Sequence, residues 1–277
     1  MLLCGLIGAG IQGSRSPALH QREAAAQGLR LAYELIDLDV LGVGAEALPE
    51  LLGDAARKGF RGLNITFPCK QAVMPLLDGL SEQARAIGAV NTVVIANGKL
   101  TGHNTDGPGW GWGFRRALPD ANVSRVVLLG AGGAGSACAD AALRLGTREL
   151  VIVDREADRG AELAARMNSI HGPRCSGTAD LARALAEASG LIHATPTGMA
   201  KIPGMPFPAS LLRAGLWVSE IVYVPLETEL LRRAKLAGCP VIDGGHMTVG
   251  QALGAFQLFT GRAADAARME AHFRSLV

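Results

Sequence analysis

The sequence contains few aromatic residues, few cysteines and no long apolar run. Aromatic residues make up 4% of the 277 positions, and no basic cluster is interleaved with them, so no nucleic-acid partner is expected. The five cysteines lie far apart without a C-x-x-C pair, which argues against a disulfide framework or a structural zinc site and favours a reducing cytosol. No segment approaches the roughly 20 apolar residues of a membrane span.

The remaining composition is typical of a globular protein. Apolar residues make up 49% of the chain and charged residues 19%, and a net charge of +2 gives no reason to expect an anionic membrane as a partner. The apolar N-terminus has no basic segment, so we expect a first strand there and not a signal peptide. A chain of 277 residues is long enough for two domains. We therefore expect a cytoplasmic α/β protein.

Strand-like and helix-like segments alternate along the chain, which predicts parallel sheets covered by helices. A hairpin is expected across the turn dipeptide Asn97-Gly98, and the glycine-rich segment 107–113 is expected to be a domain junction that leads into a connecting helix near 114–117. The other expected strands are 2–7, 31–38, 62–66, 126–129, 150–153, 191–194, 218–222 and 241–242, and the other expected helices are 17–27, 45–58, 249–259 and 263–276.

The dinucleotide-binding pattern G-x-G-x-x-G occurs twice, at 8–13 and at 130–135, each time after an apolar strand. This pattern is normally followed by an acidic residue about 20 positions later, which binds the ribose hydroxyls. Asp154 lies 154 − 135 = 19 positions after the second copy, and Asp37 lies 37 − 13 = 24 positions after the first. Spacing alone therefore does not decide between the two copies.

The residues that follow the glycines separate the two copies. The second copy leads into a helix of small apolar residues, which leaves room for a phosphate at the helix N-terminus. The first copy leads into Ser14-Arg15-Ser16-Pro17, where Ser16 is predicted to be the N-cap and Pro17 the first helical residue. Two hydroxyls at a helix N-terminus suit a small anion such as a carboxylate. We therefore predict a cofactor site at the second copy and a substrate site at the first.

Two further segments carry residues that could do chemistry. Lys70 follows the strand 62–66, at the carboxyl end where parallel sheets bind ligands, and it could exchange a proton with a hydroxyl or ketone or simply be solvated. Asp106 lies beside the glycine-rich junction, where it could hold a lysine ammonium. Asn91 and Asn104 could fix substrate hydroxyls, but residues 104–106 could equally cap the connecting helix.

Together these segments resemble the shikimate and quinate dehydrogenase family along nearly the whole chain. Eight matching segments occur in the order that the family has. They are Ser14-Arg15-Ser16-Pro17 with His20; Asn64-x-Thr66-x-Pro68-x-Lys70; Gly88-Ala89-Val90-Asn91-Thr92; Gly102-x-Asn104-Thr105-Asp106-Gly107; Gly130 to Gly135; Ala194-Thr195-Pro196-x-Gly198-Met199; Val222-Tyr223-x-Pro225-x-x-Thr228; and Asp243-Gly244-x-x-Met247 with Gly250-Gln251-Ala252.

The resemblance implies an N-terminal α/β substrate domain and a Rossmann doubly wound dinucleotide-binding domain with a cleft between them. The substrate domain would comprise 1–105 with C-terminal helices at 246–277, and the Rossmann domain would comprise 106–245. The implied reaction is reversible hydride transfer between a ring carbon of a shikimate-like acid and a nicotinamide, without a metal. The implied catalytic pair is Lys70 and Asp106, and the implied substrate-binding residues are Ser14, Ser16, Thr66, Asn91, Tyr223 and Gln251.

The implied cofactor is NAD, because Asp154 would accept hydrogen bonds from the adenosine ribose and repel a 2′-phosphate. Arg155 follows it, so weaker use of NADP stays open. Met247 has two interpretations, a core residue or a neighbour of the nicotinamide. The implied cofactor-binding residues are Gly130, Ala131, Gly132, Gly133, Ala134, Gly135, Asp154, Arg155, Thr195, Met199, Val222, Gly244 and Met247.

The chain also departs from the family pattern. His193 stands where the family usually has Asn, Glu220 where an Asp is common, and Cys69 where an aromatic residue or His is usual. Ser16, in place of the Thr common in quinate-using members, favours shikimate. These departures suggest a specialised relative that acts on quinate or aminoshikimate, and His193 leaves open a catalytically weak NAD-binding regulator. The sequence gives no prediction of the oligomeric state.

Overall fold

Two six-stranded sheets organise the chain, each in its own structural unit. The structure is a computed structural model that describes residues 1–276. Unit 1 comprises Met1–Thr105 together with the C-terminal segment from Val249, and unit 2 comprises Asp106–Thr248. Within the described residues, no helix is both long and apolar enough to cross a bilayer.

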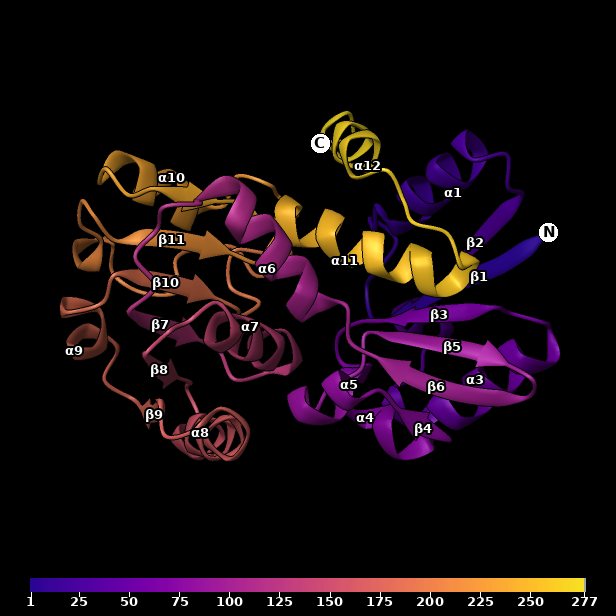
Figure 1. Cartoon of the computed structure of the whole chain (residues 1–277), viewed down its shortest axis with the longest axis horizontal. Coiled ribbons are helices and arrows are strands. Elements are labelled where there is room, and N and C mark those ends of the chain that lie inside the picture. The colour runs from indigo at the N-terminus through magenta and orange to yellow at the C-terminus, as the bar shows by residue number, and fades with distance from the viewer. Residues whose placement is uncertain (277) are drawn as a thin grey trace. The chain divides into compact units, whose positions relative to one another are not determined.

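Unit 1 contains a mixed sheet in the strand order β2-β1-β3-β5-β6-β4 (Figure 1). Its strands are β1 (Leu2–Gly8), β2 (Leu31–Asp37), β3 (Gly62–Ile65), β4 (Gly79–Leu80), β5 (Thr92–Ala96) and β6 (Lys99–His103). Its helices are α1 (Ser16–Ala26), α2 (Leu38–Leu41), η1 (Ala45–Ala47), α3 (Leu48–Arg57), α4 (Cys69–Ala72), η2 (Met74–Leu76), α5 (Glu82–Ile87) and α12 (Ala266–Arg274).

The sheet of unit 1 is mixed, so the expected parallel pairing holds for only part of it. β1 pairs in parallel with β2 and β3, but β5 is antiparallel to both β3 and β6. The predicted hairpin imposes this reversal, because Asn97 (φ 51°) and Gly98 (φ 73°) both adopt the positive φ that a two-residue turn between twisted strands requires. Strand β3 then pairs with β5, the first strand of that hairpin.

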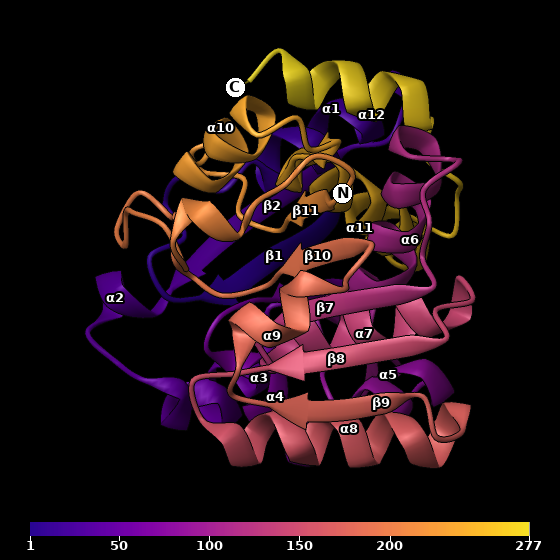
Figure 2. The same cartoon turned by 90° about the vertical axis from the view of Figure 1, so that its left-hand side faces the viewer.

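Unit 2 contains a fully parallel sheet in the order β12-β11-β10-β7-β8-β9, which Figure 2 shows from β11 to β9. The sheet consists of two sets of three strands, β7-β8-β9 and β10-β11-β12, which extend in opposite directions from the central pair β7 and β10. This is the doubly wound Rossmann arrangement. The strands are β7 (Arg125–Leu129), β8 (Glu149–Val153), β9 (Cys175–Thr178), β10 (Gly190–His193), β11 (Trp217–Glu220) and β12 (Val241–Ile242). The helices are α6 (Asp106–Ala117), α7 (Gly133–Arg144), α8 (Ala157–His171), α9 (Leu181–Ala186), η3 (Ala209–Leu211) and α10 (Glu229–Leu236), and α11 (Gly244–Thr260) begins in this unit.

The glycine-rich segment expected at the domain junction is itself helical, so the helix expected near 114–117 begins earlier, at Asp106. α6 runs through this segment, and Gly113 allows close packing that a larger residue would prevent. A Cβ on Gly113 would lie 2.8 Å from the Cβ of His246, in the first turn of α11. Trp110, on the same helix, is 3% exposed and donates a hydrogen bond from Nε1 to Ser219 Oγ at 2.9 Å. The segment therefore belongs to the core of unit 2.

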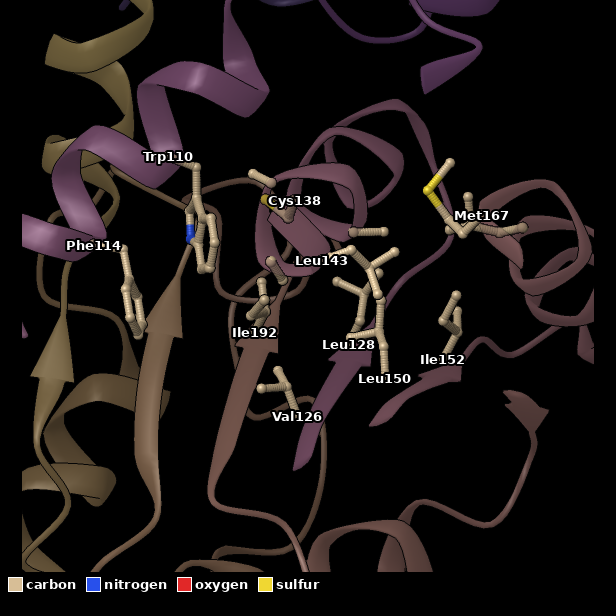
Figure 3. Packing of buried hydrophobic residues seen from close by; sticks show 14 of the residues in the cluster. Trp110, Phe114, Val126, Leu128, Cys138, Leu143, Leu150, Ile152, Met167 and Ile192 are labelled. Carbon is tan, nitrogen blue, oxygen red and sulfur yellow. The ribbon is translucent and has the colours of Figure 1, made fainter. Parts of the chain in front are cut away.

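The core of unit 2 fills the space between the sheet and helices α6, α7 and α8 (Figure 3). Val126, Leu128 and Ile192 project from the central strands toward Cys138 and Leu143 of α7. Strands buried on both faces have apolar residues at nearly every position, as in the Val126–Leu129 run. This packing fixes the carboxyl ends of β7, β8 and β10, where the second glycine segment lies.

In unit 1, His20 is an uncharged core residue. It is 0% exposed and stacks on Tyr33 at 5.0 Å and near Phe256 at 6.2 Å, and neither ring nitrogen has a hydrogen-bond partner among residues 1–276. Burial lowers its pKa from 6.5 to about 4. Because the unfolded chain binds the proton more tightly, this site favours folding above pH 6.5 and loses that contribution as the pH falls toward 4.

We expect His20→Leu to remove a pH dependence from the stability of the protein. Between pH 7 and pH 5 the wild type should lose about 2 kcal/mol of unfolding free energy through this site, and the variant should not. Urea titrations of both proteins at the two pH values measure the difference. An equal loss in both would show that His20 is not the titrating group.

Candidate active site

In unit 1, the loops that follow β1 and β3 are in direct contact. A Cβ on Gly8 would lie 2.3 Å from Thr66 Cγ2, so this approach requires glycine at residue 8. The Ala9 amide donates a hydrogen bond to the Phe67 carbonyl oxygen at 2.9 Å. Thr66 is therefore held beside the first glycine segment, at the carboxyl edge of the sheet.

Asp37 is hydrogen-bonded to the first glycine segment. Its carboxylate accepts hydrogen bonds from the amides of Gly10 at 2.8 Å and Ile11 at 3.0 Å and from Gln12 Nε2 at 3.0 Å. Burial opposes the ionisation of Asp37, but these bonds and one from the Asp39 amide outweigh it and hold the pKa of the carboxyl below its ordinary value. Since the amides of Gly10 and Ile11 are already used, they are not available to a pyrophosphate.

The two serines lie at the N-terminus of α1. The helix begins at Ser16, and its N-cap is Arg15, so the prediction of Ser16 as the N-cap was wrong. Ser14 Oγ accepts a hydrogen bond from the Ser16 amide at 3.3 Å and so caps the first turn weakly. Ser16 is 7% exposed and Ser14 is half-buried. Both serines therefore lie at the positive end of the helix dipole, as an anion site requires.

Asn91 lies in a buried polar cluster with Thr92 and Thr105. Its Oδ1 accepts hydrogen bonds from the Thr105 amide at 2.7 Å and Thr92 Oγ1 at 3.0 Å, and its Nδ2 donates to Thr105 Oγ1 at 2.9 Å. Asn64 joins the cluster by donating from Nδ2 to Thr92 Oγ1 at 3.1 Å. The sequence pattern does not indicate that Asn64, Thr92 and Thr105 fix Asn91, although each lies in a segment that matches the family.

The other three predicted residues adjoin this cluster along the chain or on a helix face. The Lys70 carbonyl oxygen accepts a hydrogen bond from the Val90 amide at 2.8 Å, one residue before Asn91. Asp106 directly follows Thr105 and is 4% exposed. A Cβ on Gly254 would lie 3.1 Å from Thr105 Cγ2, so α11 packs on the cluster, and Gln251 lies one turn earlier on that face.

In unit 2, the second glycine segment forms a tight turn into α7. Gly130 has φ 107°, and a Cβ there would lie 2.7 Å from the Ala194 carbonyl oxygen. A Cβ on Gly135 would lie 1.9 Å from the Gly130 carbonyl oxygen. A Cβ on Gly132, the N-cap of α7, would meet nothing within 4 Å. Open space at a helix N-terminus fits the pyrophosphate of a dinucleotide.

Asp154 follows β8 and fixes the same turn. Its Oδ2 accepts a hydrogen bond from the Ala131 amide at 2.7 Å, and its Oδ1 accepts one from the Glu156 amide at 3.0 Å. A carboxylate has about four acceptor positions, so ribose hydroxyls could still bind. Arg155 is exposed beside it.

The remaining predicted cofactor residues lie around the ends of β10 and β11. Thr195 Oγ1 is 2.6 Å from His193 Nε2. Met199 is 41% exposed, and its neighbour Ala200 donates a backbone hydrogen bond to the Val224 carbonyl oxygen at 3.1 Å. The positions of the others differ in exposure: Val222 is 7% exposed and Tyr223 half-buried; Gly244 packs so closely that a Cβ would lie 2.4 Å from the Val222 carbonyl oxygen; and Met247 is 7% exposed within the core of unit 2.

The structure also reveals a buried pair that sequence reasoning treated as two unrelated departures. His193 Nδ1 lies 2.8 Å from Glu220 Oε1, and the two side chains are 0% and 1% exposed. Their simultaneous departure from the family pattern was the available signal. Among residues 1–276, no three His, Cys, Asp or Glu side chains converge as a metal site would require.

Two family models match the chain. Residues 6–93 match the shikimate dehydrogenase substrate binding domain, and residues 114–202 match shikimate / quinate 5-dehydrogenase. The chain is 55% identical to a shikimate dehydrogenase (NADP(+)) of Streptomyces avermitilis, over 99% of this chain and 95% of that protein. It is 46% identical to a quinate/shikimate dehydrogenase (NAD(+)) of Corynebacterium glutamicum, over 99% of each.

Solved structures agree with these matches. Quinate dehydrogenase from Corynebacterium glutamicum in complex with NAD superposes with a TM-score of 0.90 at 45% identity, over 99% of both chains. Shikimate 5-dehydrogenase from Thermus thermophilus in complex with NADP(H) and shikimate superposes with a TM-score of 0.87 at 35% identity, over 100% of both chains.

Proposed function

Because the chain belongs to the shikimate dehydrogenase family, we propose that it catalyses the reversible NAD(P)-dependent oxidation of a ring hydroxyl of shikimate or quinate. The single observation that carries this proposal is the match of the two family models, a substrate binding domain at 6–93 and a dehydrogenase at 114–202. Unit 1 would bind the acid and unit 2 the dinucleotide. The bound nicotinamide supplies the hydride acceptor.

The residues of unit 1 would hold the substrate by its polar groups. Ser14 and Ser16 would bind the carboxylate at the N-terminus of α1, where the helix dipole favours an anion. Thr66, Asn91 and Gln251 would hydrogen-bond ring hydroxyls. Because Asn91 is fixed by Thr92 and Thr105, its amide would be presented in one orientation.

Lys70 and Asp106 would transfer the proton of the reacting hydroxyl. As the hydride leaves the ring carbon, the hydroxyl loses its proton to the Lys70 amine, and a carbonyl forms. Asp106 would orient the lysine. In the reverse direction the Lys70 ammonium returns the proton to the alkoxide oxygen, so no metal is needed.

The residues of unit 2 would hold the dinucleotide. The turn 130–135 would bind the pyrophosphate over Gly132, and Asp154 would accept hydrogen bonds from the adenosine ribose. The nicotinamide half would be lined by Thr195, Met199, Val222, Gly244 and Met247. Tyr223 would contact the substrate. The charge of Asp154 favours NAD over NADP, while Arg155 leaves weaker NADP binding.

The test is dinucleotide reduction with shikimate, quinate and aminoshikimate in parallel, with NAD and with NADP. We expect turnover with shikimate or quinate and a higher kcat/KM with NAD. Dinucleotide binding without oxidation of any of the three acids would refute the proposal and favour a dinucleotide-binding regulator.

Asp154→Asn tests the cofactor preference. Asn keeps an acceptor for the Ala131 amide but removes the charge that repels a 2′-phosphate. We expect the NAD/NADP ratio of kcat/KM to fall about tenfold. This corresponds to about 1.4 kcal/mol, which lies between the roughly 1 kcal/mol of a close like-charge contact in water and the roughly 4 kcal/mol of one near a protein surface. Steady-state kinetics with both dinucleotides measure the ratio, and an unchanged ratio would show that Asp154 does not set it.

A further inference from the structure

The pair formed by His193 and Glu220 joins two neighbouring strands at their carboxyl ends. His193 ends β10 and Glu220 ends β11, and the two residues are direct partners in the parallel register. Since both side chains are almost fully buried, their polar atoms must be satisfied within the protein. The hydrogen bonds that satisfy these atoms determine which group of His193 faces Thr195.

The hydrogen bonds of Glu220 fix the orientation of the imidazole. Glu220 Oε1 accepts from the amides of Ile221 at 2.9 Å and Val222 at 3.0 Å, and Oε2 accepts from Thr228 Oγ1 at 2.9 Å. An ionised carboxylate only accepts, so His193 Nδ1 donates to Oε1 at 2.8 Å. In the neutral ring Nε2 is then an acceptor, and the Thr195 hydroxyl donates to it at 2.6 Å.

Thr195 is thereby held in one rotamer against the glycine turn. Its proton is directed at His193, so its oxygen faces other neighbours as an acceptor, as it does toward the Thr197 amide at 3.3 Å. Its methyl group lies where a Cβ on Gly130 would approach within 3.1 Å. The pair therefore connects the turn that follows β7 to the segments that follow β10 and β11.

The strand order indicates which half of the dinucleotide Thr195 would meet. Asp154, the candidate for the adenosine ribose, follows β8 on one side of β7, and Thr195 follows β10 on the other side. In a doubly wound sheet the dinucleotide lies across the point where strand order reverses, so the nicotinamide half falls on the β10 side.

We propose that His193 and Glu220 are positioning residues, which hold the Thr195 oxygen as an acceptor for a hydroxyl or amide donor on the nicotinamide half of the dinucleotide. This inference rests on the proposed dinucleotide site of unit 2. It gives a joint role to two residues that depart from the family pattern, because an Asn at 193 is too short to bridge Glu220 and Thr195.

The experiment measures dinucleotide affinity by calorimetry, without substrate, for His193→Asn, Thr195→Val and the double variant. Each single variant should raise the Kd about tenfold, which corresponds to the loss of one hydrogen bond of about 1.4 kcal/mol. The double variant should lose little more than either single variant, because both remove the same interaction. In steady-state assays KM for the dinucleotide should rise with little change in kcat.

His171→Asn is the matched control. His171 Nε2 also lies 2.8 Å from a buried carboxylate, Asp140 Oδ1, but at the last residue of α8, about 20 Å along that helix from its first turn. This variant should leave the Kd unchanged. An unchanged Kd in Thr195→Val, or an equal rise in His171→Asn, would overturn the proposal.

The two proposals can fail separately. If the wild type binds NAD or NADP but oxidises no acid, the proposed function fails, while the binding data still decide the role of His193. If neither dinucleotide binds, the positioning role fails as well. Should His193→Asn not fold, Thr195→Val still tests the hydroxyl with little change in shape.

Discussion

Replacement of Lys70 by alanine should reduce kcat about 10³-fold, within the range that loss of a positioned general acid–base produces. The amine is the group that would exchange the hydroxyl proton, and no other lysine lies in the cluster around Asn91 that we describe. Because Lys70 belongs to unit 1 and the glycine turn belongs to unit 2, dinucleotide affinity should be unchanged. Single-turnover kinetics with saturating acid and calorimetry with the dinucleotide measure the two quantities.

Lys58→Ala provides the matched control, because Lys58 is an exposed lysine of the same unit that follows α3. It should retain wild-type kcat and affinity. A Lys70→Ala enzyme with more than about a tenth of wild-type kcat would refute an acid–base role, since even modest proton-transfer catalysis exceeds tenfold. A large rise in KM for the acid with unchanged kcat would instead assign Lys70 to substrate binding.

The Rossmann unit could be predicted from the sequence because its signals are local. The apolar runs that form β7, β8 and β10 have the length of buried strands, and the glycine turn and Asp154 have the expected spacing. The parallel sheet follows from the alternation of strands and helices.

The errors arose where packing overrides local propensity. Glycine is unfavourable in a helix interior, and the connecting helix was expected only near 114–117, after the glycine-rich segment 107–113. In the structure α6 includes it, because Gly113 allows the close approach of His246 and Trp110 is anchored to Ser219. Such a compensation depends on residues more than 100 positions away, which no local pattern contains.

The sequence could propose the residues of the candidate site, but not the network of hydrogen bonds around them. The motif segments identified Asn91 and Thr195, whereas the side chains that fix them became visible only in three dimensions. Asp37 shows the same limit, because its spacing from the first glycine segment allowed a ribose-binding role. The structure instead directs its carboxylate to the amides of Gly10 and Ile11.

Gly135→Ala should reduce dinucleotide affinity about 100-fold and lower the unfolding free energy of the protein by about 3 kcal/mol, at the upper end of overpacking costs. Helix propensity predicts the opposite, a gain of about 1 kcal/mol for alanine inside α7. The contact decides the sign, because the added Cβ would lie 1.9 Å from the Gly130 carbonyl oxygen, and backbone must move to relieve it. That movement would open the turn that is proposed to hold the pyrophosphate. Urea unfolding and calorimetry give the two quantities.

Gly132→Ala distinguishes an effect on the stability of the turn from an effect on the space beside it, where the pyrophosphate would bind. A Cβ there would meet no protein atom within 4 Å, and the residue has φ −75°, which alanine adopts without strain. Its unfolding free energy should therefore fall by no more than about 1 kcal/mol, the cost of alanine at an N-cap, while the methyl group would occupy the space assigned to the pyrophosphate and weaken binding. If Gly132→Ala bound the dinucleotide normally while Gly135→Ala did not, the turn would be required for folding alone, and the pyrophosphate would have to bind elsewhere.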